Sequence, residues 1–125
     1  MGIVADLLQN VSIPKMAPIR QSFDDTHIAL EQIPEVVRQQ LSRPEIADKI
    51  KPGMEIAITV GSRGVANVAL ITRAIADTVK SFGAVPFVVP AMGSHGGATA
   101  EGQRGVIETY GVTEDYIGWH PYSCL

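Results

Sequence analysis

Two segments of the sequence combine glycine, serine and a basic residue in the same order. Gly61-Ser62-Arg63-Gly64 and Gly93-Ser94-His95-Gly96 both follow the pattern Gly-Ser-basic-Gly, and they begin 32 positions apart. An imidazole exchanges protons near neutral pH, and a guanidinium holds a carboxylate through two parallel hydrogen bonds. Glycines let the backbone approach a ligand, and amides at a helix N-terminus attract anions. The pattern therefore predicts acid–base chemistry on a small carboxylate.

Each residue of these segments receives a predicted role. We predict that His95 is the catalytic acid–base group and that Arg63 anchors the substrate carboxylate. The other predicted substrate-binding residues are the small and polar positions of both segments: Gly61, Ser62, Ser94, Gly96 and Gly97. A solvated surface role is the alternative for Arg63, because glycine-rich turns are common. His95 has little core to pack against in such a loop, which favours a functional role.

Other chemistries fit the sequence less well. The segment 93–97 lacks the Gly-Lys-Ser/Thr of a phosphate-binding P-loop and the glycine spacing of a dinucleotide fingerprint. A nucleophile elbow around Ser94 would require glycine two positions before the serine, but that position is Met92. His95, His120 and Cys124 show no recognisable metal-ligand spacing, so no metal site is predicted.

Regular elements must position the two segments. A turn at 52–53 precedes a predicted strand over 54–60. A helix follows from an N-cap at Asn67, with one apolar face and a terminating glycine at 83. A second strand spans 85–89 and is apolar on both faces, as in a covered parallel sheet. Thr99 then caps a shorter helix that ends near Tyr110 and is closed by Gly111. The apolar face of the first helix consists of Val68, Ile71, Ile75, Val79 and Phe82.

Strand, helix and strand in this order predict a parallel βαβ unit. The expected fold class is α/β, a parallel βαβ-based layered sheet with a Rossmann-like N-terminal domain. In open α/β sheets the ligand crevice lies beyond the carboxyl ends of the strands, where both glycine segments emerge. If the strands are neighbours, Arg63 and His95 face the same crevice.

The first fifty residues carry weaker signals. Residues 4–11 have the spacing of a short amphipathic helix, and residues 13–23, bracketed by Pro14 and Pro18, are expected as an extended edge segment. A helix is predicted over 34–41 and ends before Pro44. Ser42 and Glu45 then have the spacing of a capping box for a new helical turn.

The amino-acid composition excludes several classes of protein. The chain has 125 residues, 46% of them hydrophobic and 18% charged, with a net charge of −3. This balance excludes intrinsic disorder and argues against a general nucleic-acid binder. The single cysteine, Cys124, is compatible with a reducing cytosol. No apolar stretch approaches the length of about 20 residues that a membrane helix needs. We therefore expect a cytoplasmic protein with neither a nucleic acid nor a membrane as its partner.

The sequence resembles the lactate-racemase-like family of nickel-pincer-dependent 2-hydroxyacid racemases and epimerases. The resemblance rests on residues 60–64 and 90–99 and extends from about residue 5 to residue 117. It implies an α/β N-terminal domain that packs against a C-terminal domain, with substrate and cofactor in the cleft between them. In that family the nickel-pincer nucleotide accepts a hydride from the substrate's α-carbon, and a histidine removes the hydroxyl proton. His95 matches that histidine, and Arg63 matches the substrate-holding arginine.

Departures from the family pattern shape these expectations. The lactate racemases have His-Thr-Arg-Pro in the first segment, so another 2-hydroxy acid is the expected substrate. The family's second catalytic histidine, nickel ligand and cofactor-tethering lysine have no counterpart here. We therefore expect residues 1–125 to be one domain, the N-terminal half of a larger two-domain protein, with 119–125 as an atypical tail. Alone it is expected to be inactive and to retain no cofactor. Its expected partners are the C-terminal domain and, through an exposed apolar face, a second copy.

A second hypothesis belongs to another class. The same βαβ unit and glycine-rich loops would serve a non-catalytic domain that binds small anions or supports assembly, with a genuine end at Leu125. Binding of phosphate without any response to 2-hydroxy acids would favour this alternative.

Overall fold

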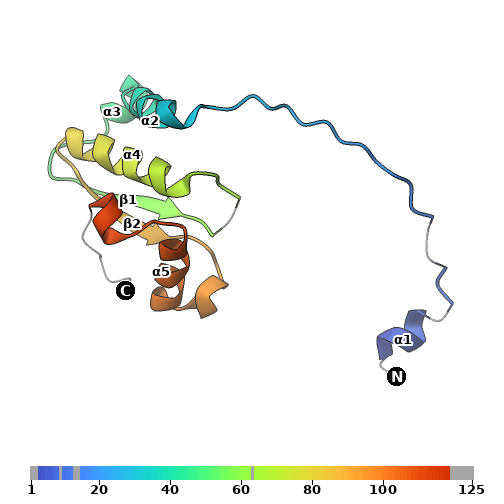
Figure 1. The fold of residues 1–125 in the computed structure, drawn as a ribbon. Helices are drawn as coiled ribbons and strands as arrows, with labels where there is room; N and C mark the ends of the chain where they lie inside the picture. Colours follow the sequence, from blue (N-terminus) through green and yellow to red (C-terminus); the bar gives the residue numbers. More distant parts are fainter. Residues whose placement is uncertain (1–2, 9, 13–14, 63, 119–125) are drawn as a thin grey trace.

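The fold is taken from a computed structural model, which describes residues 3–8, 10–12, 15–62 and 64–118 (Figure 1). The elements in chain order are α1 (Ile3–Leu8), η1 (Leu30–Gln32), α2 (Ile33–Leu41), α3 (Pro44–Ala47), β1 (Glu55–Val60), α4 (Val68–Ser81), β2 (Val85–Pro90), η2 (His95–Ala98), α5 (Ala100–Thr109) and α6 (Glu114–Ile117).

The two strands pair side by side and in parallel. Their register runs from Glu55 opposite Val85 to Val60 opposite Pro90, and α4 connects them. The predicted βαβ unit is therefore confirmed, and the domain is mixed α/β. Within the described ranges the sheet consists of these two strands.

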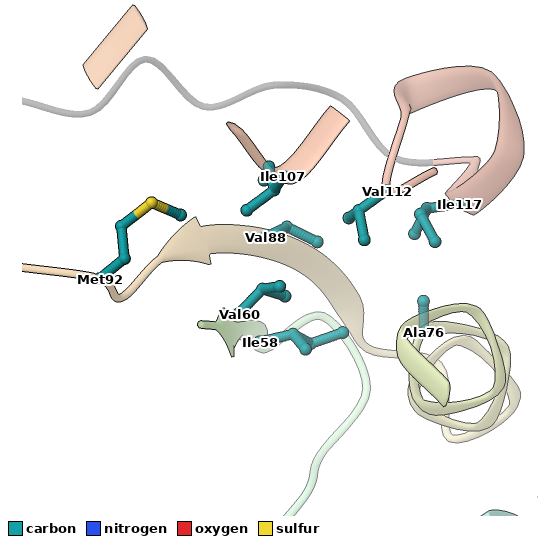
Figure 2. Close-up of a cluster of buried hydrophobic side chains, with 8 residues drawn as sticks. All are labelled: Ile58, Val60, Ala76, Val88, Met92, Ile107, Val112 and Ile117. Atoms are coloured by element: carbon teal, nitrogen blue, oxygen red, sulfur yellow. The ribbon is translucent and has the colours of Figure 1, made fainter. Parts of the chain in front are cut away.

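The hydrophobic core lies against one face of the sheet. Figure 2 shows apolar side chains from both strands meeting those of α4, α5, α6 and the connecting loops. Ile107 and Val112 are 1% and 0% exposed, so the segment after β2 supplies the largest fully buried side chains of this core. The cluster comprises Ile58, Val60, Ala76, Val88, Met92, Ile107, Val112 and Ile117.

The opposite face of the sheet differs from the sequence expectation. Alternate residues of a strand point to opposite faces. Ala57 and Thr59, which alternate with the core residues of β1, are exposed, and Val85 in β2 is 49% exposed. The expectation of a sheet covered on both faces is therefore wrong at these positions. The physical reason is that α4, α5 and α6 all contribute to the core on the same face.

Helix α4 is buried on more than one side. Its fully buried residues are small or β-branched rather than the predicted apolar set, of which only Val79 is buried. The helix packs between the sheet and α2, which lies along it (Figure 1). Thr72 and Thr78 are accommodated because their hydroxyls donate to the carbonyls of Val68 and Ala74, at 2.7 and 2.8 Å.

The predicted helix ends are confirmed in most cases. Gly83 and Gly111, directly beyond the turns that end α4 and α5, have φ of +79° and +84°, which suits glycine. Helix α2 ends at Leu41, close to the predicted position. The capping box at Ser42 and Glu45 is wrong: Arg43 is the N-cap of α3 and no side chain caps it, because Ser42 still belongs to the end of α2.

In the described part of the N-terminal region, α1 is followed by no further regular element before residue 30. Helix α1 ends at Leu8, three residues earlier than expected. Of the predicted edge segment, positions 13 and 14 lie outside the described residues, and 15–23 are exposed and unpaired with the sheet. In the part of the chain described, no helix has both the length and the apolar character that crossing a membrane requires.

Candidate functional site

The two glycine segments emerge at the same edge of the sheet. Gly61 follows the last residue of β1, and Ala91 follows the last residue of β2. Because Val60 and Pro90 are paired in register, the two loops start side by side. The Ala91 amide donates to the Val60 carbonyl at 2.8 Å and extends this pairing by one step. The topology thus brings residues about thirty positions apart to one place.

A serine of the first loop contacts the histidine of the second. Ser62 Oγ lies 2.5 Å from His95 Nδ1, and this contact is partly buried. A hydroxyl both donates and accepts hydrogen bonds, so it can hold the ring in either neutral tautomer and in the protonated form. An imidazole whose Nδ1 is held by a neighbour is oriented for proton exchange at Nε2. The structure therefore brings together two of the predicted site residues, one from each loop.

The second loop forms a left-handed turn. Gly96, Gly97 and Ala98 have φ of +62°, +69° and +58°, three consecutive residues in a region that L side chains rarely adopt. His95 is the first residue of this turn, η2, and the turn is followed by the N-terminus of α5. Ser94 precedes it and is exposed, without a capping hydrogen bond from its side chain.

Gly96 is packed against the helix that follows it. A Cβ added to Gly96 would collide with the backbone of Gly102 and Gln103, and one added to Gly102 would collide with the Gly96 carbonyl. A Cβ on Gly97 would meet nothing within 4 Å. Gly96 and Gly97 were both predicted from the sequence to bind substrate. The structure gives Gly96 a packing role within the chain itself.

Two further hydrogen bonds fasten this loop to α5. Gln103 Nε2 donates to the Gly93 carbonyl at 2.6 Å. Thr99 caps α5 as predicted, because its Oγ1 accepts from the Gly102 amide at 3.1 Å. The residue that holds Gly93, Gln103, was not predicted, since a glutamine on a helix face gives no sequence signal of its partner.

The first loop is built differently. It leads into α4 through Asn67, which has φ of +57° and whose side chain makes no capping hydrogen bond. The predicted position of the N-cap is confirmed, but the predicted capping role of the side chain is wrong because its left-handed backbone departs from the extended conformation usual for a side-chain cap. Arg63 lies outside the described residues, so its role as a carboxylate anchor stays a prediction.

A small pocket adjoins the first loop. It has a volume of about 60 Å³ and is lined by Gly61, Gly64, Val65, Val68 and Tyr110. Tyr110 comes from the end of α5 and reaches α4 because the chain turns there: a Cβ on Gly111 would lie 3.4 Å from the Ala69 Cβ. Sequence reasoning missed Val65, Val68 and Tyr110, since no motif links them to the glycine segment.

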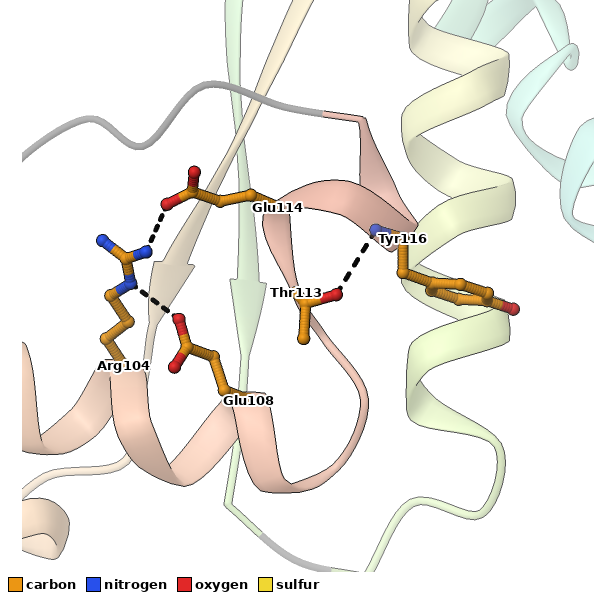
Figure 3. A network of polar contacts seen from close by, with 5 residues as sticks. All are labelled: Arg104, Glu108, Thr113, Glu114 and Tyr116. Atoms are coloured by element: carbon orange, nitrogen blue, oxygen red, sulfur yellow. Dashed lines mark hydrogen bonds and ion pairs between the residues drawn. The ribbon is translucent and has the colours of Figure 1, made fainter.

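Polar contacts hold α5 to α6 behind the second loop (Figure 3). Arg104 donates to Glu108 at 2.8 Å and also to Glu114 at the start of α6. The hydrogen bond to Glu108, followed by the charge of Glu114, raises the pKa of the Arg104 guanidinium. Thr113 Oγ1 accepts from the Tyr116 amide at 3.3 Å and caps α6. The Tyr116 ring lies under Arg73 of α4, with 5.0 Å between the guanidinium carbon and the ring centroid.

A metal site built from side chains needs several ligating groups close together. Nowhere among the described residues do three or more histidine, cysteine, aspartate or glutamate side chains gather as a set that could hold an ion. His120 and Cys124, considered in the sequence analysis, lie outside the described residues, as does the expected tail 119–125. The nickel cofactor that the family resemblance implies therefore stays a prediction.

Comparisons with protein-family models, with curated proteins and with solved structures each found no significant match. The class is thus defined by the fold and the site alone. It is an α/β domain in which a serine and a histidine, from two loops at the carboxyl edge of a parallel strand pair, lie within hydrogen-bond distance of each other.

Proposed function

We propose that this chain is a Rossmann-like N-terminal domain of a 2-hydroxyacid racemase or epimerase, similar to the lactate-racemase-like family. In this proposal the two glycine loops form one wall of a cleft that binds a small 2-hydroxy acid. A C-terminal domain supplies the other wall, and a nickel-pincer nucleotide supplies hydride chemistry when bound. The proposed setting is the cytoplasm, with homo-oligomers as a further proposal.

One observation carries the proposal: the 2.5 Å contact between Ser62 Oγ and His95 Nδ1. When a 2-hydroxy acid is racemised through loss of hydride from its α-carbon, as in this proposal, a base must take the hydroxyl proton and later return it. With Nδ1–H donating to Ser62, Nε2 is the base that accepts the substrate proton. Once that proton has been accepted, the same Nδ1–H···Oγ bond persists, so Ser62 positions His95 in both states.

The remaining residues of the loops have supporting roles in this proposal. Arg63 binds the carboxylate through paired hydrogen bonds and thereby fixes which atom of the substrate faces His95. The backbone amides of Gly61, Ser94 and Gly97 act as secondary donors. A Cβ on Gly97 would meet nothing within 4 Å, which leaves space for a ligand beside its backbone.

Titrations of the chain with a 2-hydroxy acid and with inorganic phosphate test the proposal. The histidine ring resonances are followed by NMR, and they are assigned with His95→Gln and His27→Gln variants. We expect 2-hydroxy acids to shift the His95 ring and to lose at least about tenfold in affinity in His95→Gln, the usual scale for a charged hydrogen-bond partner. His27→Gln serves as the matched control, because His27 is exposed and, in the part of the chain that the structure describes, its ring is hydrogen-bonded to the Asp25 carbonyl in its own turn, at 2.7 Å.

Ser62→Ala tests the positioning of the imidazole separately. We expect it to change the tautomer populations of His95, read from ring ¹⁵N shifts, and to cost about 0.5–1.5 kcal/mol of stability for one hydrogen bond. Ser42→Ala, an exposed serine at the end of α2, is the control. Equal affinity for phosphate and for 2-hydroxy acids, unchanged in His95→Gln, would overturn the proposal and favour the non-catalytic anion-binding domain.

A further inference from the structure

Residues 15–29 form an arm that precedes η1 and leads away from the domain (Figure 1). Within it, residues 19–24 alternate between a side with two large apolar residues and a side that is polar throughout, as in a half-buried β-strand. The first side consists of Ile19, Gln21 and Phe23, and the second of Arg20, Ser22 and Asp24. Ile19 and Phe23 are 91% and 73% exposed. Such a segment buries its apolar side only when a sheet receives it.

The outer edge of β2 is a poor template for a further strand. The Val85 amide donates to the Met54 carbonyl at 2.8 Å, so it points towards β1. Because successive amides of a strand point to opposite edges, the amide positions at 86, 88 and 90 face outward. Pro86 and Pro90 have no N–H to offer there.

The outer edge of β1 is an intact template. By the same alternation its outward backbone groups include those of Ala57 and Thr59, which are exposed. Within the described residues neither has a backbone hydrogen bond outside the strand pair. The strand contains no proline or lysine, and its register with β2 is continuous, so it lacks the usual protections of an edge. On the core side of this strand, Ile56 is half-buried.

We propose that residues 19–24 add to the outer edge of β1 in a second copy of this chain, which returns its own arm. The segment matches the six residues of β1 in length. Ile19 and Phe23 then lie beside Ile56 on the core side of the receiving sheet, and the polar side continues the exposed face that carries Thr59. The exchange is isologous and therefore closes as a dimer. It is independent of the proposed chemistry at His95.

The order of the layers favours a second copy over the arm's own sheet. The arm leads into η1 and α2, and α4 packs between α2 and the sheet (Figure 1). A return to its own β1 would have to pass α4, about 10–12 Å across, within residues 25–29, which span at most about 18 Å. The chain also turns at this point, because the Thr26 amide and hydroxyl both donate to Asp24 Oδ1, at 2.9 and 2.6 Å. A neighbouring molecule is not subject to this limit.

Sedimentation equilibrium of the chain measures the dissociation constant of the dimer. Phe23→Ser should weaken dimerisation about a hundredfold, because each of the two arms loses a buried side chain worth about tenfold. Met16→Ser is the matched control. Met16 is 89% exposed on the same arm but continues the polar side of the alternation, so the dissociation constant should change less than about twofold. Equal weakening by the two variants would overturn the proposed strand addition.

A mixed-label NMR experiment locates the arm. A nitroxide is attached at Ser22→Cys in a chain that also carries Cys124→Ser, and this chain is mixed with ¹⁵N-labelled chain. We expect the Ala57 and Thr59 amide signals of the labelled chain to broaden, and Phe23→Ser in the nitroxide chain to abolish the effect.

Three results would overturn the proposal. The first is broadening only when nitroxide and ¹⁵N are in the same molecule, because the arm then folds onto its own sheet. The second is a chain that stays monomeric at NMR concentrations, and the third is a dimer that persists in Phe23→Ser. The proposed function is tested separately, by the titrations with 2-hydroxy acids, so its failure would be distinguishable from these results.

Discussion

The two glycine loops share a sequence pattern but differ in how the structure supports them. The loop after β2 is fastened to its own helix, through Gly96 against Gly102, Gln103 to Gly93 and the Thr99 cap. The loop after β1 enters α4 without a side-chain cap, and its Ser62 contacts His95 of the other loop. The first loop lies beside a pocket, and the second contains a tightly packed left-handed turn.

The two loops therefore suit two different roles, although they share one sequence pattern. In the proposed function His95 transfers a proton and must be held in a fixed place, and the anchored second loop is suited to this. In the same proposal the first loop binds the ligand, which needs space, and Gly61 and Gly64 line the pocket beside this loop. The same residue type, glycine, thus serves close packing in one loop and openness in the other.

The largest effect that we expect comes from Gly96→Ala. The variant combines a left-handed backbone, costing about 1–2 kcal/mol, with a collision against the Gly102 backbone of a further 1–3 kcal/mol. A loss of about 2–5 kcal/mol in the free energy of unfolding should appear in urea denaturation. Gly97→Ala is the control: it has a similar φ but no collision, and should lose only about 1–2 kcal/mol. Equal losses at 96 and 97 would show that the loop is not packed on α5.

Substitutions at the N-cap residues of α5 and α4, which follow the two loops, should change the stability of the domain by different amounts. Thr99→Ala removes the hydrogen bond to the Gly102 amide and should cost about 1 kcal/mol. Asn67→Gly removes no side-chain cap and relieves a left-handed non-glycine residue, so its stability should stay within about 0.5 kcal/mol of wild type. Thermal unfolding measures both. A loss at Asn67 as large as that at Thr99 would contradict the structural difference between the loops.

The smallest effect is expected far from both loops, at the ion pair on α2. Arg38 donates to both carboxylate oxygens of Glu35, at 2.9 and 2.7 Å, and this hydrogen bonding, with a further one from Gln39, lowers the pKa of Glu35. A carboxyl whose pKa is lowered on folding contributes stability above its unfolded pKa and loses it as the pH falls through the folded value. Both side chains are exposed, so the contribution is small.

Acid titrations of Tm test this contribution. Wild type should lose slightly more stability than Glu35→Gln as the pH falls from about 5 to about 3, where the carboxylate becomes protonated. Arg38→Gln should resemble Glu35→Gln, and the double variant should add nothing further. A pH dependence identical in wild type and Glu35→Gln would contradict the lowered pKa.

The amino-acid sequence by itself determined the central regular elements and the ends of α4 and α5. The two strands, the helix between them and the glycines at 83 and 111 were predictable because strand patterning and left-handed helix ends are local properties. The parallel βαβ unit followed from the order of the elements. The pairing of the two glycine segments at one edge was foreseen for the same reason, since parallel neighbours end together.

The tertiary structure decided which described residues of those segments contact one another and the rest of the domain. The contact between Ser62 and His95, the packing of Gly96 on Gly102 and the arrival of Tyr110 beside Gly61 each join parts of the chain that local patterns treat as independent. The burial of Thr72 and Thr78 in α4 and the exposure of Ala57 and Thr59 in β1 likewise depend on which faces other elements cover. A local pattern reports conformational preference, whereas distances between side chains are fixed only when the elements pack.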